Sequence, residues 1–168
     1  MFKNKGITIL ETLIYTAILG LVVFTIFKSL SSTITTHRAI KLSQTLESSA
    51  AVSMERILRE IRNADSIDMG VSSFNSSPGI LKLSGIDEND VDYTITFDLS
   101  GGVMRVTKDS GTPAAITSSA ITISSLIFRS VSTSNSEAVR VEISFTGSAG
   151  GVTRDLDLFG FAVLRGSY

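Results

Sequence analysis

Two different hydrophobic patterns divide the chain. Residues 7–27 form an apolar run in which Glu11 is the only charge. Beyond it, apolar positions recur every three or four residues, and residues 28–64 contain neither Pro nor Gly, which is typical of a helix with one apolar face. The apolar stripe consists of Ala39, Leu42, Leu46, Ala50, Met54, Ile57, Ile61 and Ala64. We therefore predict one unbroken helix over about residues 7–64, with an apolar half and an amphipathic half.

The rest of the chain follows a two-residue period. Residues 65–79 carry turn formers without a period, and beyond them apolar residues alternate with polar ones, which indicates strands. The runs lie at residues 80–83, 91–97, 103–108, 121–131, 139–145 and 156–163, with Gly-containing turns at 100–102 and 148–151. Because the apolar sides of helix and strands need mutual cover, we predict an α+β fold. Residues 28–64 of the helix would pack on an antiparallel β-sheet head of residues 65–168.

Composition and charge exclude several classes of function. The chain has 168 residues and is 43% hydrophobic, which indicates one folded domain. Fifteen basic against sixteen acidic residues give a net charge of −1, so there is no basic excess for a nucleic-acid partner. The absence of Cys and the single His remove thiol chemistry and Cys/His zinc sites. We expect no catalytic residues, no cofactor and no metal site, and hence not an enzyme.

The apolar run is long enough to cross a membrane. As a helix rising about 1.5 Å per residue, residues 7–27 would span roughly 30 Å, the thickness of a bilayer core. Lys3 and Lys5 precede the run without any acid, which favours a cytoplasmic N-terminus and an extracytoplasmic head. The alternative is a secretory signal peptide, whose apolar region is usually shorter. We expect a single-pass protein of the cytoplasmic (inner) membrane.

A short signal precedes and enters this run. Residues 6–14 read Gly-Ile-Thr-Ile-Leu-Glu-Thr-Leu-Ile after a short basic leader. Counted from Ile7, Glu11 is the fifth residue. This arrangement resembles the class III signal of type IV pilins and type II secretion pseudopilins, although the family commonly has Phe where this chain has Ile7. More faintly, residues 55–64 and 121–128 resemble minor pilins and J-type minor pseudopilins.

The resemblance implies maturation and assembly. Residues 1–6 would be a prepilin leader, cut between Gly6 and Ile7 by a prepilin peptidase that also methylates the new amine of Ile7. Glu11 would then pair with that amine of a neighbouring subunit at an inner-membrane assembly platform, where the helix leaves the lipid for a filament. The chain would be a structural minor subunit, a pilin or pseudopilin, exposed on a filament or at the cell surface. The resemblance does not choose between secretion, motility, adhesion and DNA uptake, or between tip and shaft.

Glu11 is also unusual on physical grounds, because it is a charged residue within an apolar run. A carboxylate in a lipid-facing helix costs on the order of 2.5 to 3.5 kcal/mol on insertion scales, so such groups normally have a partner. No cation stands three or four residues away in the sequence. The structural alternative is a Glu tolerated at the membrane interface. A second class of function also stays open, a signal-anchored extracytoplasmic binding module or enzyme.

Two further features carry weaker signals. His37 has no acid three or four residues away, which favours a solvated surface side chain over a catalytic one. Glu88, Asp90 and Asp92 alternate like the opening of a calcium loop, but the Gly and the distal Glu of an EF-hand are missing. A solvated loop is therefore the favoured interpretation, and calcium binding in another geometry stays open because some pseudopilins of the resembled family bind calcium.

Overall fold

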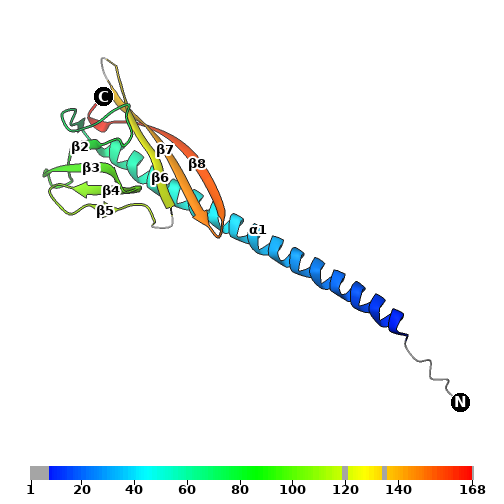
Figure 1. Cartoon of the computed structure of the whole chain (residues 1–168). Helices are drawn as coiled ribbons and strands as arrows, with labels where there is room; N and C mark the ends of the chain where they lie inside the picture. The colour runs from blue at the N-terminus through cyan, green and yellow to red at the C-terminus, as the bar shows by residue number, and fades with distance from the viewer. Residues whose placement is uncertain (1–7, 119–120, 134–135, 168) are drawn as a thin grey trace.

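The computed structural model describes residues 8–118, 121–133 and 136–167. In these parts of the chain, one long helix is followed by two antiparallel sheets, so the predicted α+β fold is confirmed (Figure 1). The elements are α1 (Ile9–Asn63), β1 (Ser66–Ile67), β2 (Leu81–Ile86), β3 (Asp92–Ser100), β4 (Val103–Lys108), β5 (Ala114–Ala115), β6 (Ile121–Ser132), β7 (Glu137–Ala149), β8 (Val152–Val163) and a closing 3-10 turn, η1 (Arg165–Ser167).

Helix α1 is continuous, as the pattern predicts. It runs unbroken from Ile9 to Asn63 and ends where Ala64 takes an extended conformation with φ −75° and ψ 146°. Every predicted stripe residue from Leu42 onward is buried, whereas Ala39 is only half-buried. The burial of Ser53 was not predicted. Its hydroxyl donates to the carbonyl oxygen of Ser49 at 2.7 Å, so the polar atom is satisfied within the helix and the residue packs like a small apolar one.

The strands form two sheets rather than one. Strands β1 to β5 form a five-stranded sheet in sequence order, and β6 to β8 form a three-stranded sheet, all antiparallel. Backbone hydrogen bonds join β6 to the loops of the five-stranded sheet: Ile123 donates to Gly102 at 2.8 Å, and Gly79 donates to Leu126 at 2.8 Å. The sequence pattern predicts the long strands but not this division, because alternation reports only that each strand has a buried side.

One hydrophobic core lies between α1 and the two sheets. The helix packs mainly against β7 and β8, which run along its second half. Phe97 comes from the five-stranded sheet and Phe128 and Phe145 from the three-stranded sheet, and all three are fully buried in one cluster with the stripe of α1. The prediction that the stripe covers the apolar side of the strands is thus confirmed.

Two glycines let the helix approach its sheet closely. A Cβ at Gly160 would lie 2.6 Å from Sδ of Met54, and a Cβ at Gly147 would lie 2.8 Å from Cδ1 of Leu46. A side chain at either position would therefore have to displace the helix side chain that fills this space, Met54 or Leu46. Side chains alternate along β8, and Leu158, Gly160 and Ala162 lie on the side of the strand that faces the helix. This alternation places Phe161, which the sequence pattern groups with Leu158, on the outer face, where 56% of it is exposed.

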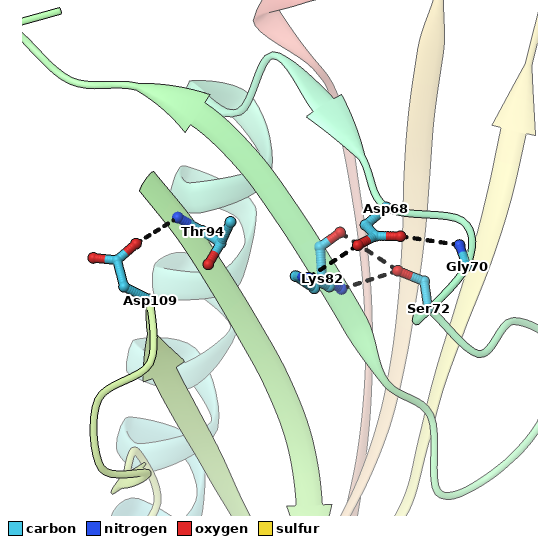
Figure 2. A network of polar contacts seen from close by, with 6 residues as sticks. All are labelled: Asp68, Gly70, Ser72, Lys82, Thr94 and Asp109. Atoms are coloured by element: carbon cyan, nitrogen blue, oxygen red, sulfur yellow. Dashed lines mark hydrogen bonds and ion pairs between the residues drawn. The ribbon is translucent and has the colours of Figure 1, made fainter. Parts of the chain in front are cut away.

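Polar contacts fix the loops of the five-stranded sheet, as Figure 2 shows. The Asp68 carboxylate forms a salt bridge with Nζ of Lys82 at 3.0 Å and accepts a hydrogen bond from the backbone N–H of Gly70 at 3.0 Å. The Ser72 hydroxyl accepts from the backbone N–H of Lys82 at 3.0 Å, so the segment after β1 is held against β2. Elsewhere in the sheet, Oδ1 of Asp109 accepts from the N–H of Thr94 at 2.8 Å. These contacts give the irregular segments a defined conformation.

Candidate functional site

The first half of α1 projects away from the head (Figure 1). It contains a window long and apolar enough to cross a membrane, and none of that window is buried in the structure. Leu13, Phe24 and Phe27, for example, are each more than 60% exposed. Soluble proteins rarely expose a continuous apolar surface of this size, so this part of the helix needs lipid or other helices as its surroundings. The chain is thus compatible with single-pass membrane anchoring.

The candidate assembly residue Glu11 lies in the first turn of α1. Thr8 precedes the helix in an extended conformation and its hydroxyl accepts from the backbone N–H of Glu11 at 3.3 Å. Thr-x-x-Glu is the sequence of a capping box, in which the acid would reach back to the N–H of the Thr. That half of the box is not formed, because the Glu11 side chain makes its hydrogen bond in the other direction, with Tyr15. A carboxylate in the first turn is also stabilised by the helix dipole.

Tyr15 is the partner that sequence reasoning missed. Its hydroxyl donates to Oε1 of Glu11 at 2.9 Å, across one turn of the helix. No cation lies three or four residues from Glu11 in the sequence, but a phenol at the fourth position is a neutral donor with the same reach. Among the residues that the structure describes, no cation forms an ion pair with Glu11.

The other polar side chains near Glu11 are satisfied by the helix itself. The hydroxyl of Thr12 donates to the carbonyl of Ile9 at 2.8 Å, and that of Thr16 donates to the carbonyl of Thr12 at 2.8 Å. Thr25 donates in the same way to the carbonyl of Val22 at 2.7 Å. Hydroxyls bonded to backbone carbonyls can enter lipid at little cost, so Glu11 is left as the one charged group of the described apolar half.

The remaining predicted assembly residues lie outside the described part of the chain. This applies to the leader of residues 1–6, to the cleavage positions Gly6 and Ile7, and to the methylation position Ile7. His37 lies exposed on α1, beyond the apolar half. Among residues 8–118, 121–133 and 136–167, the fold brings no titratable group other than Tyr15 to Glu11, because the described part of the head packs against the second half of the helix.

Of the three acidic residues that could resemble a calcium loop, Glu88 and Asp90 lie in the turn between β2 and β3, and Asp92 is the first residue of β3. Glu88, Asp90 and Asp92 are all exposed. The turn is shaped by Asp87, whose Oδ1 accepts from the N–H groups of Asn89 at 2.8 Å and Val91 at 3.0 Å. These hydrogen bonds lower the pKa of the Asp87 carboxyl below its usual value. Within residues 8–118, 121–133 and 136–167, no group of three or more potential ligands is arranged to hold a metal ion.

A charged cluster occupies the outer face of the three-stranded sheet. Oε1 of Glu142 in β7 forms salt bridges with Nε of Arg129 at 2.8 Å and with Nε of Arg140 at 3.0 Å. Arg129 also donates to Oδ1 of Asn75 at 3.1 Å. Arg140 lies over the ring of Phe159, 5.6 Å from its centroid. The cluster therefore ties the outer face of β8 to β6 and to the loop before β2.

This cluster leads to a prediction about acid stability. The hydrogen bond from Arg129 holds the pKa of Glu142 below its ordinary value of 4.5. A carboxyl whose pKa is lowered by folding stabilises the head above its unfolded pKa and loses that contribution as pH falls through the folded pKa. In a head fragment of residues 29–168, we expect Glu142→Gln to lose less free energy of unfolding than wild type between pH 6 and about pH 3. Urea unfolding at both pH values measures the difference, and equal losses would contradict it.

Comparison with known proteins gives no match, since no protein-family model, no curated protein and no solved structure is significantly similar to the chain. The structure itself shows a long N-terminal apolar helix whose second half packs on antiparallel sheets, an architecture compatible with pilin-like proteins.

Proposed function

We propose that the chain is a structural minor subunit of a type IV pilus-like or type II secretion filament. In this proposal, a prepilin peptidase removes residues 1–6 and methylates Ile7. Before assembly, the subunit lies in the inner membrane with its N-terminal end on the cytoplasmic side. The assembly platform then inserts the apolar half of α1 among the helices of other subunits. The observation that carries the proposal is a continuous α1 whose apolar half is unburied and holds a single carboxylate in its first turn.

The division of α1 suits both environments that the proposal requires. Its first half offers an apolar surface on all sides, which fits lipid before assembly and neighbouring helices afterwards. Its second half is committed to the head through the stripe from Leu42 to Ile61. The head therefore stays folded while the first half of the helix exchanges one apolar environment for the other.

Glu11 supplies the specificity that apolar packing lacks. Apolar helices can slide past one another at little cost, whereas a buried carboxylate has one favourable position relative to a cationic partner. The amine of Ile7 in a neighbouring mature subunit is the partner that the resemblance implies. Pairing would remove the cost of the carboxylate and set the register of one subunit against the next.

The test is the variant Glu11→Ala. Hydrogen bonds to charged groups are worth about 1.5 to 3 kcal/mol, so incorporation into filaments should fall about ten- to a hundredfold relative to wild type. The measurement compares the protein in the inner membrane with that in sheared surface filaments or assembled pseudopili. Insertion should not suffer, because the variant helix is more apolar than the original.

Thr12→Val is a matched control. It removes a neighbouring polar group whose hydrogen bond is internal to the helix, and it should assemble like wild type. Equal incorporation of Glu11→Ala and wild type would remove the proposed role of Glu11. A mature N-terminus well beyond Phe24 would instead indicate a secretory signal peptide and the alternative class of function.

A further inference from the structure

We propose that Tyr15 is a positioning residue for Glu11, which holds the carboxylate ready for the amine of the neighbouring subunit. This inference rests on the proposed function. It starts from the hydrogen bond at 2.9 Å between the Tyr15 hydroxyl and Oε1 of Glu11, the one side-chain hydrogen bond that this carboxylate makes with the described residues.

The contact fixes where the carboxylate points. Tyr15 is four residues beyond Glu11, which places its Cα about 6 Å further along the helix, on the same side and deeper in the apolar half. Without this donor, a Glu in the first turn would turn back toward the N-terminus, where water and the free N–H groups of the helix lie. The phenol therefore keeps the carboxylate at a depth that solvation would otherwise oppose.

The contact also leaves the carboxylate able to bind a cation. An ionised carboxylate has about four acceptor sites, and the phenol occupies one of them. Because the phenol is neutral, it does not cancel the charge that attracts an amine. Before assembly, Tyr15 thus supports an unpaired Glu11 in lipid. It remains bound to Glu11 when the amine of the next subunit arrives. Such preorganisation reduces the ordering cost of association.

The ring of Tyr15 is not part of the hydrophobic core of the head. It is 58% exposed, and residues 12–38 of α1 are all exposed with respect to the described part of the head. Its hydroxyl donates to Glu11, unlike those of the neighbouring threonines, which donate to backbone carbonyls. The hydroxyl can therefore be removed without disturbing the core of the head.

The experiment compares Tyr15→Phe, Glu11→Ala and the double variant in the full chain. Tyr15→Phe keeps the ring and removes the donor, and incorporation into filaments should fall roughly two- to tenfold, the cost of ordering one side chain on association. In the Glu11→Ala background, the second substitution should cause no further loss, because Tyr15 acts through Glu11. Thr16→Val, which removes an adjacent hydroxyl bonded within the helix, should behave like wild type.

A spectroscopic measurement follows the hydroxyl directly. The chain has three tyrosines, so the 13Cζ signal of Tyr15 can be assigned in the micelle-bound protein with Tyr93 as an internal reference. Glu11→Ala should shift the Tyr15 signal and leave the Tyr93 signal in place.

The outcomes separate the two levels of the proposal. If Glu11→Ala loses assembly while Tyr15→Phe assembles like wild type, the positioning role is wrong and the proposed function stands. Additive losses in the double variant, or a Tyr15 signal that ignores Glu11→Ala, would also overturn the positioning role. If Glu11→Ala itself assembles normally, the proposed function falls.

Discussion

Gly6→Leu is expected to leave residues 1–6 attached to the whole population of the protein. By the resemblance, the peptidase that recognises this signal requires a very small residue before the cut, and Gly6 occupies that position. The uncut chain would keep the charges of Lys3 and Lys5 next to the apolar half and would lack a free amine at Ile7. Filament incorporation should therefore be lost together with cleavage. Mass spectrometry of membrane fractions separates the cut and uncut forms.

Ile7→Phe is the control for this prediction. It replaces the first mature residue by the one that the family most often carries, so cleavage should proceed as in wild type. A Gly6→Leu protein that still loses residues 1–6 would contradict the class III assignment. Sequencing the mature N-terminus then shows which signal is present instead.

The second large effect is expected in the core between helix and sheets. A fragment of residues 29–168 should be soluble and unfold cooperatively, because the stripe of α1 is covered by strands and the removed half contributes nothing to the core. In this fragment, Ile57→Ala should lower the free energy of unfolding by about 2 to 5 kcal/mol. Ile57 is fully buried in the cluster shared by both sheets, so the deleted atoms leave a cavity.

Val52→Ala is the matched control on the same helix. Val52 is 60% exposed, and its truncation should change the free energy of unfolding by no more than about 0.5 kcal/mol. Urea unfolding followed by circular dichroism measures both variants. A fragment without a cooperative transition would show that the head needs the first half of α1, and similar losses for the two variants would place the core elsewhere.

Most of the helix and the long strands could be predicted from the sequence because each has a period that burial enforces. From Leu42 onward every apolar position that the pattern places in the stripe of α1 is buried, since a helix with one covered face allows few other positions, and Ser53 is the buried residue that the pattern leaves out. The partition into two sheets was not predicted, because hydrogen bonds such as that from Ile123 to Gly102 join segments that no local pattern relates. Strands β1 and β5, of two residues each, are too short to carry a period.

The candidate site shows a similar limit. Glu11 was found because a charge in an apolar run is conspicuous, and the family signal assigns it a role. Tyr15 was overlooked because a Tyr in an apolar helix is usually counted as a hydrophobic residue, although its hydroxyl lies within reach of position i−4. Phe161, which the sequence pattern groups with Leu158, lies on the outer face of β8 because Gly160 and Ala162, which are small, carry the helix-facing positions at that point.

The parallel course of α1 and β8 has a mechanical consequence. The turn at Gly150 lies beside Arg38, Gly160 lies against Met54, and the N–H of Arg165 donates to the carbonyl of Ala64 at 3.0 Å. These contacts follow one another in the same order along helix and strand, so a pull along the helix axis loads all of them together in shear. Separating the helix from the sheet sideways would instead break them one at a time. The head is therefore built to resist extraction of its helix along the direction in which the helix points.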